Sequence, residues 1–390
     1  MMHASDARTA IDTVLIKVAS RCNLNCDYCY VYNMGDEGWR PQPNRMSRAV
    51  AEKVALALGE LCAHQQLPFN VVMHGGEPLL LGAADLELLC SALRRALPRS
   101  CGIDVQTNGV LLTEPIIDVF DRYEVGVSIS IDGPAQVHDR HRVDHNGLGS
   151  HARVASGVAR LRKHASGARL FAGVLCVIDP QSDPRTVYEF LKETGAPSLD
   201  FLPRDGNWDR LPFGKLEAMS VEYGEWLETL LDVYLADLTP PRVRILDDML
   251  RLLLGGRSRK EGVGEIDYGI LVIEPDGRID KNDTLKVAHA EADRFDASWN
   301  VQDHSLIEIV NSESFALYHR MQRPTASRCL ACSVRTICGG GMVAHRWSEE
   351  LGFDNPSIFC ADQLHLIGAM QARIIAAQGT GEQEIFHVCA

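Results

Sequence analysis

The sequence contains no apolar run long enough to cross a bilayer, and its first twelve residues, MMHASDARTAID, contain no apolar core like that of a signal peptide. We therefore expect a cytoplasmic protein that works without a membrane. Positive charge is also scarce, because 39 Lys and Arg stand against 52 Asp and Glu, for a net charge of −13. Phosphate binding needs a clustered basic surface, so this balance argues against nucleic acid as a partner.

Cysteine is absent from the long stretch between Cys176 and Cys329, although the chain has twelve cysteines in all. In a reducing compartment such cysteines are read as metal ligands or core residues rather than as disulfides. Cys389 is penultimate, and we expect it in a frayed tail. Those that lie among Leu, Val and Ala are expected to be buried as small apolar side chains: Cys62, Cys90, Cys101 and Cys176.

The first half of the chain alternates short apolar strands with amphipathic helices. Six strand candidates separated by helical patterns predict a parallel βα sheet, open or closed into a barrel. The candidates are residues 13–19, 69–74, 103–108, 125–131, 170–178 and 198–203. After about residue 205 the pattern changes to helices at 219–236 and 243–254, a flexible connector, a hairpin at 268–279 and a closing helix at about 361–377.

Three cysteines follow the first strand in RCNLNCDYCY: Cys22, Cys26 and Cys29. Four thiolates saturate a four-iron cluster, whereas three leave one iron free for a small ligand. A zinc ion completed by a distant residue such as His74 is the rival interpretation, and three incidental cysteines are the other.

Distinctive motifs end the next three strands: HGGEP at 74–78, QTNG at 106–109 and SIDG at 130–133. Each motif alone reads more readily as a turn. In a βα barrel, however, functional groups collect at the carboxyl ends of strands, so their joint placement predicts a site there. The alternation in VGVSISI also puts Ser128 and Ser130 on one face, opposite the bulky apolar residues.

A second cysteine set has the spacing C-x2-C-x5-C, with a fourth cysteine 22 residues beyond the last. Four thiolates suffice for a closed iron–sulfur cluster or for a structural zinc ion, and spacing alone leaves both open. The set consists of Cys329, Cys332, Cys338 and Cys360.

CNLNCDYC resembles the signature of radical S-adenosylmethionine (SAM) enzymes. The resemblance implies an α/β fold: a partial (β/α)6 TIM-type barrel, with Cys22, Cys26 and Cys29 holding a [4Fe–4S] cluster whose open iron binds SAM. It also implies roles for residues at the strand ends. These are a SAM amine contact at Gly75, Gly76 and Glu77, a SAM carboxylate or ribose contact at Ser130, help in holding SAM from Arg142, and a peptide-substrate contact at Gln106.

The second cysteine set resembles the SPASM domain of peptide-modifying radical SAM enzymes, which holds two auxiliary clusters. This sequence has Met342 and Asn282 at two cysteine positions of that pattern, and all the missing ligands belong to one cluster. We therefore predict two [4Fe–4S] clusters, one for SAM and one auxiliary cluster with four cysteines. The predicted divisions are the barrel at 1–215, bridging helices and a connector at 216–265, and a smaller SPASM/twitch-like domain at 266–390.

Asp283 follows Asn282, at the place of an aspartate that acts as general base in sulfatase-maturing relatives. Burial would raise its pKa toward a useful value, and the rival interpretation is a turn aspartate.

YVYNMGDEGWRPQP, LCVIDP and NDTLK resemble the FxsB-type, three-residue cyclophane-forming maturases. That group joins an aromatic ring to the Cβ of a residue two positions later in a ribosomally synthesised precursor peptide. A flavodoxin or ferredoxin is the implied electron-transfer partner. The alternatives are a formylglycine-generating sulfatase maturase and a non-catalytic iron–sulfur or zinc protein.

Overall fold

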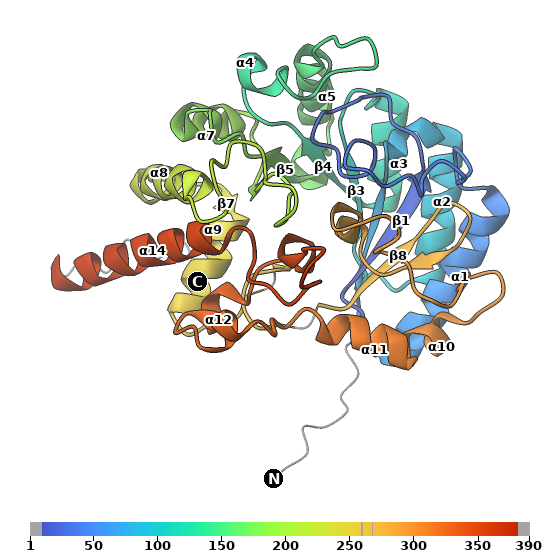
Figure 1. Ribbon diagram of the computed structural model, residues 1–390. Coiled ribbons are helices and arrows are strands. Elements are labelled where there is room, and N and C mark those ends of the chain that lie inside the picture. Colours follow the sequence, from blue (N-terminus) through green and yellow to red (C-terminus); the bar gives the residue numbers. More distant parts are fainter. Residues whose placement is uncertain (1–9, 259, 267, 381–390) are drawn as a thin grey trace.

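One nine-stranded sheet runs through the chain in the order β7-β6-β5-β4-β3-β2-β1-β8-β9 (Figure 1). The computed structural model describes residues 10–258, 260–266 and 268–380, so Cys389 lies outside the described residues. Parallel pairing joins β7 through β8, and β9 is antiparallel to β8. The strands are β1 (Thr13–Ala19), β2 (Asn70–Gly75), β3 (Ile103–Thr107), β4 (Val125–Ser130), β5 (Phe171–Val177), β6 (Ser198–Leu202), β7 (Arg242–Val243), β8 (Ile270–Ile273) and β9 (Ile279–Asp280).

Helices connect the first six strands, as the alternating pattern predicts, and they cover the outer face of the curved sheet (Figure 1). Ser47 caps the first of them by accepting a hydrogen bond from the Val50 amide. The helices of this part are α1 (Arg48–Gln65), η1 (Pro78–Leu81), α2 (Ala83–Ala96), α3 (Glu114–Tyr123), α4 (Ala135–His138), α5 (His151–Lys163), α6 (Gly167–Leu170) and α7 (Pro184–Glu193).

The two faces of the sheet differ in burial. In β4 the outward-facing Val127 and Ile129 are completely buried against helices, whereas the inward-facing Ser128 is only partly buried. The same alternation marks β2 and β3. The inner face of the sheet is therefore packed less tightly than the outer face, although Lys17 on β1 and Ser130 at the end of β4 are buried there.

The rest of the chain joins this sheet at both ends: β7 pairs with β6 along two residues, and β8 pairs with β1 along four. The predicted hairpin is present as β8 and β9, but the predicted flexible connector is packed: the Gly264 amide donates to the Ile337 carbonyl at 3.0 Å, and Val263 is buried. The helices here are α8 (Glu222–Ala236), α9 (Arg244–Leu253), η2 (Asp283–Val287), α10 (Leu306–Val310), α11 (Glu313–Arg320), α12 (Ser327–Leu330), α13 (Arg335–Cys338), η3 (Val343–Arg346) and α14 (Cys360–Thr380).

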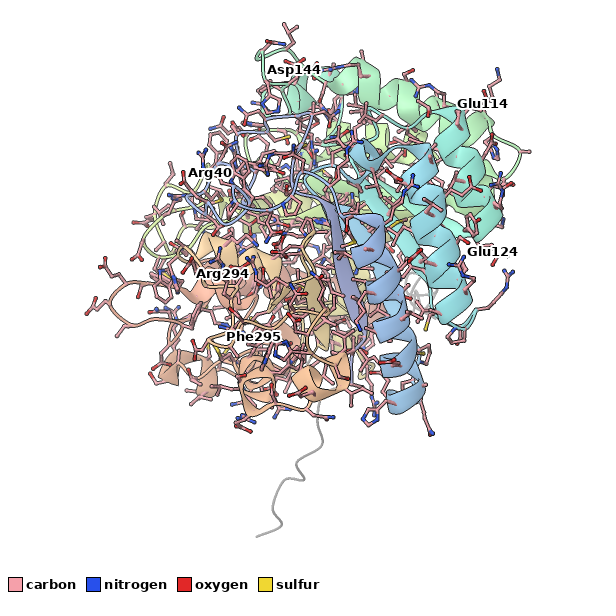
Figure 2. The ribbon with its side chains drawn as sticks, turned by 90° about the vertical axis from the view of Figure 1, so that its right-hand side faces the viewer. Arg40, Glu114, Glu124, Asp144, Arg294 and Phe295 are labelled. Carbon is pink, nitrogen blue, oxygen red and sulfur yellow. The ribbon has the colours of Figure 1, made fainter. Side chains whose placement is uncertain are left out.

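The loop after the cysteines bridges the two halves. Figure 2 shows Arg40 from this loop and Arg294 from the C-terminal part on the same side of the molecule. A Cβ on Gly38 would lie 2.8 Å from Arg294 Nη2, so the loop and the later segment are in close contact. No helix in the described ranges is both long and apolar enough to cross a membrane.

Candidate active site

The three N-terminal cysteines lie in the loop that follows β1. Its backbone is fixed by hydrogen bonds from the Cys29 amide to the Cys26 carbonyl at 3.0 Å and from the Asn33 amide to the Cys29 carbonyl at 2.8 Å. Burial raises the pKa of Cys26 to about 11, the Arg142 charge lowers it, and the negative charge of Cys29 raises it further. Cys22 also feels the charges of both other thiols. The three cysteines are therefore close enough for their charges to act on one another.

The spacing of the cysteines argues against zinc. A tetrahedral zinc ion with Zn–S bonds of about 2.3 Å would hold its sulfur atoms about 3.8 Å apart. In the described part of the chain, the group whose ligand atoms all lie within 4.8 Å of one another consists of three carboxylates and contains no cysteine. A cluster spreads its ligands farther apart than a single ion does, so both cysteine sets fit iron–sulfur clusters better than zinc.

The glycine pair of HGGEP packs against the cysteine loop. The Gly76 amide donates to the Ala19 carbonyl at 2.9 Å, and the Glu77 amide donates to the Arg21 carbonyl at 3.0 Å. A Cβ on Gly76 would lie 2.0 Å from Tyr32 Oη and 2.4 Å from the Arg21 carbonyl oxygen, and Gly75 has a φ of +128°. Both positions therefore require glycine for the loop to take this path.

The Glu77 carboxylate is completely buried and fully engaged. It accepts hydrogen bonds from Thr107 Oγ1 at 2.6 Å, from the Asn108 amide at 2.8 Å and from the Leu79 amide at 3.0 Å. Burial raises the pKa of Glu77 although these bonds favour its ionised form. The side chain thus ties the end of β3 to η1, and Asn108 in turn contacts Cys22 Sγ at 3.8 Å.

Arg142 lies beside the cysteine loop with its guanidinium held from one side. Its Nε donates to Asp132 Oδ2 at 3.0 Å, and the same oxygen accepts the Tyr28 hydroxyl at 2.5 Å. Asp132 Oδ1 accepts the Val177 amide at 3.0 Å. Within the described residues, no hydrogen bond is recorded for the two Nη groups of Arg142, so they are available to an anion such as a carboxylate.

Ser130 and Gln106 meet on the inner face, where Gln106 Nε2 donates to Ser130 Oγ at 2.9 Å. The strand register continues this polar row, because Gln106 pairs with Ser128 and Lys17 pairs with His74. Polar side chains therefore cross β1 to β4 just below the cysteine loop.

Asp283 lies at the start of η2 and is 1% exposed. Its Oδ1 pairs with the ammonium groups of Lys17 and Lys286, and its Oδ2 accepts the Tyr30 hydroxyl at 2.9 Å. The expectation of a raised pKa is wrong. Burial raises the pKa of Asp283, but the charges of Lys17 and Lys286 outweigh burial and hold it well below the usual range.

The second cysteine set is brought together by α12, α13 and the first residue of α14. Burial raises the pKa of Cys338 to about 12, and the charges of Cys360, Cys329 and Cys332 add to this effect. Such charge effects act over short distances, so the fold brings these four cysteines, up to 31 positions apart in the sequence, near one another.

Asn282 and Met342 stand where the SPASM pattern has cysteine, and the packed connector fills the space beside them. Asn282 Nδ2 donates to Glu261 Oε1 at 2.6 Å, and a Cβ on Gly262 would lie 2.8 Å from Met342 Cγ. The residues at this place do not fit a further cluster.

Sequence reasoning missed Asp132, Tyr28, Lys17 and Tyr30 as parts of the site. Asp132 belongs to SIDG, but only its contacts reveal that it joins the cysteine loop to Arg142. His138 is another residue that joins these segments. It is completely buried, and its ring nitrogens contact the Asp132 amide at 3.3 Å and Ser150 Oγ at 2.9 Å.

Comparison with known proteins identifies the barrel. Residues 16–191 match the model of the radical SAM superfamily. The chain carries a radical SAM domain. A cysteine-type anaerobic sulfatase-maturating enzyme of Clostridium perfringens is 26% identical over 348 residues, which cover 87% of this chain and 90% of that protein. A serine-type anaerobic sulfatase-maturating enzyme of Bacteroides thetaiotaomicron is 26% identical over 360 residues, which cover 86% of this chain and 83% of that protein.

Solved structures share the fold over almost the whole chain. The structure of native anSMEcpe with bound AdoMet superimposes with a TM-score of 0.80 at 22% identity, covering 94% of this chain and 98% of that one. Streptococcus suis SuiB bound to its precursor peptide SuiA gives a TM-score of 0.60 at 14% identity, covering 86% and 73%. The predictions of a radical SAM α/β fold and of an enzyme that uses SAM and [4Fe–4S] clusters are confirmed.

Proposed function

We propose that this radical SAM enzyme is a peptide maturase that forms a cyclophane crosslink between an aromatic ring and the Cβ of a residue two positions later. One contact carries the proposal. Tyr30 directly follows Cys29, and its hydroxyl donates to Asp283 Oδ2 at 2.9 Å, so an ionised carboxylate lies beside the cysteine loop. Crosslinking removes a hydrogen atom from Cβ and later a proton and an electron from the ring. A fixed carboxylate near the radical source suits the proton step.

We assign Cys22, Cys26 and Cys29 to the SAM cluster, and the cysteines at 329, 332, 338 and 360 to the auxiliary cluster. When bound, SAM and its cluster supply a 5′-deoxyadenosyl radical. Arg142, oriented by Asp132, would hold the SAM carboxylate through its free Nη groups, and Ser130 would contact the carboxylate or the ribose. Gln106 would contact the peptide from the inner face of the barrel.

Asp283 would accept the ring proton. Its lowered pKa keeps it ionised and makes it a weak base, which suffices for a proton on a ring that has lost its aromaticity. In this proposal a small electron-transfer protein such as a flavodoxin or ferredoxin exchanges electrons with the enzyme, which works in the cytoplasm.

Formylglycine formation is the second candidate, and the relatives named as sulfatase-maturating enzymes favour it. The connector that fills the Asn282 and Met342 positions counts against it, because the resemblance implies a further cluster there in those enzymes.

Tandem mass spectrometry on a short precursor peptide encoded beside this chain, co-expressed with it, tests the proposal. Loss of two hydrogens, with fragmentation suppressed from an aromatic residue across the next two, is the expected result. An aldehyde at a single serine or cysteine would instead establish formylglycine chemistry. The Asp283→Asn variant should cleave SAM without completing the crosslink, with Asp296→Asn, an exposed aspartate nearby, as the matched control.

A further inference from the structure

A group of buried charged side chains surrounds Asp283 where β8 and β9 meet the segment after them. We call it the Asp283 cluster. Apart from Arg278, its members are at most 4% exposed, so they interact in a medium that screens charge weakly. The cluster consists of Lys17, Glu274, Arg278, Asp280, Asp283, Lys286 and Asp293.

The cluster has three basic groups and four carboxylates. Lys17 Nζ is 3.1 Å from Glu274 Oε1, and Arg278 contacts both Asp280 oxygens at 2.9 and 3.0 Å. Lys286 Nζ is shared among Glu274, Asp283 and Asp293, at 3.4, 2.7 and 2.5 Å. One negative charge is therefore in excess. An uncompensated buried charge is costly, so the folded protein gains by neutralising it.

Two features place the excess charge at Asp280 and Asp293. Asp293 Oδ1 is buried and has no hydrogen-bond partner among the described residues. One oxygen each from Glu274, Asp280 and Asp293 lies within 4.8 Å of the other two. A proton between two such carboxylates replaces their repulsion with a hydrogen bond and would satisfy the unpartnered oxygen.

We propose that Asp280 and Asp293 share one proton at neutral pH, and that Asp293 is a positioning residue that acts on Asp283 through Lys286. With the proton in place Asp293 attracts Lys286 less, and the ammonium stays at Asp283 Oδ1. Burial, with the charges of Asp293 and Glu274, raises the pKa of Asp280 to about 7 against the opposing Arg278. The positioning role rests on the proposed function, whereas the shared proton does not.

A divalent cation is the other way to neutralise three carboxylates. Here all three already have basic partners: Lys17 and Lys286 at Glu274, Arg278 at Asp280 and Lys286 at Asp293. These positive charges would repel a metal ion, so the geometry favours the proton.

The sign of the pH effect follows from the raised pKa. A carboxyl group that is more basic in the folded state stabilises the fold at low pH, and this contribution is lost as the pH rises through about 7. From pH 6 to pH 8 this one group lowers the folding equilibrium constant about tenfold. Burial lowers the pKa of His74 on β2, which favours its neutral form. Half-buried Lys281 lies over the Phe295 ring at 5.4 Å, and the charge of exposed Asp296 acts on it ahead of those of Asp293 and Asp280. Because Lys281 is partly in solvent and shared with Asp296, it offsets the buried excess of negative charge only in part.

The experiment compares urea unfolding of the anaerobic holoenzyme at pH 6 and pH 8 for the wild type, Asp293→Asn and Asp296→Asn. An amide at 293 can donate to Asp280 as the shared proton does. Between pH 6 and pH 8 the folding equilibrium constant of Asp293→Asn should therefore fall about tenfold less than that of the wild type. The exposed Asp296 control should behave like the wild type. An equal pH dependence in wild type and Asp293→Asn would overturn the shared proton.

Two further measurements complete the test. If Asp293→Asn does not fold, infrared absorption of a protonated carboxyl group in the wild type, present at pH 6 and lost by pH 8, supports the proton, and its absence overturns it. One equivalent of non-iron divalent metal in purified wild type would overturn it in favour of a cation.

The positioning role has its own measurement. The ratio of peptide product to SAM cleaved should fall several-fold from pH 6.5 to 8 in the wild type but not in Asp293→Asn. If neither the wild type nor Asp293→Asn makes product while the unfolding results hold, the positioning role and the proposed function fail and the shared proton stands.

Discussion

Asp132 offers the sharpest test of how the proposed SAM site is organised. Its two oxygens accept three hydrogen bonds, from Tyr28, Arg142 and the Val177 amide, and it is 3% exposed. The Asp132→Asn substitution keeps the shape of the side chain but leaves only one oxygen that can accept a hydrogen bond. If that oxygen stays with the Val177 amide, an NH2 group faces Arg142 Nε, and two donors oppose each other.

The size of the effect follows from the bond that is lost. Tyr28 can turn its hydroxyl elsewhere, whereas Arg142 is buried and its guanidinium is rigid. A hydrogen bond to a charged group contributes about 1.5–3 kcal/mol. If Arg142 holds the SAM carboxylate, the dissociation constant of SAM should rise roughly 10- to 150-fold.

The assay is equilibrium binding of SAM to the anaerobic holoenzyme, with iron content measured first to show that the cluster is intact. Asp118→Asn is the matched control, because that side chain is 57% exposed on the far helix α3. Tyr28→Phe should weaken binding less than Asp132→Asn, since it leaves the contact between Asp132 and Arg142 in place.

A double-mutant cycle decides whether Asp132 acts through Arg142. In that case Asp132→Asn combined with Arg142→Gln should bind SAM no more weakly than Arg142→Gln alone. Fully additive losses, or wild-type binding by Asp132→Asn, would refute the reasoning.

Three other substitutions have expected outcomes. Gly76→Ala should lose the iron of the SAM cluster because its Cβ would meet Tyr32 and the Arg21 carbonyl, whereas Gly368→Ala, with open space around it, should keep all the iron and the fold. Lys17→Met leaves the buried acids with one cation fewer and should cost about 3–5 kcal/mol in the free energy of unfolding. Arg48→Met, which breaks an exposed pair, should cost less than about 1 kcal/mol in the same urea titration. Cys360→Ser should lower the iron content from about eight to about four per chain while the SAM cluster remains visible by electron paramagnetic resonance.

The sequence alone determined the order of strands and helices in the barrel. Period-two alternation in strands such as 125–131 and the apolar face of α1 are local patterns, and each is imposed by which side of the element meets the core. The same reasoning located Cys22, Cys26 and Cys29 and the glycine pair, because motifs at strand ends must meet at one edge of a parallel sheet.

Only the tertiary structure decided the electrostatics. From the local sequence Asp283 is predicted to be a buried acid with a raised pKa. Its pKa is instead lowered, because Lys17, 266 positions earlier, and Lys286 both form ion pairs with it. Likewise, nothing in the connector sequence indicates that Glu261 and Gly262 would fill the place of a missing cluster. Charge pairing and the filling of space depend on distances between residues remote in the sequence, and those distances exist only once the chain has folded.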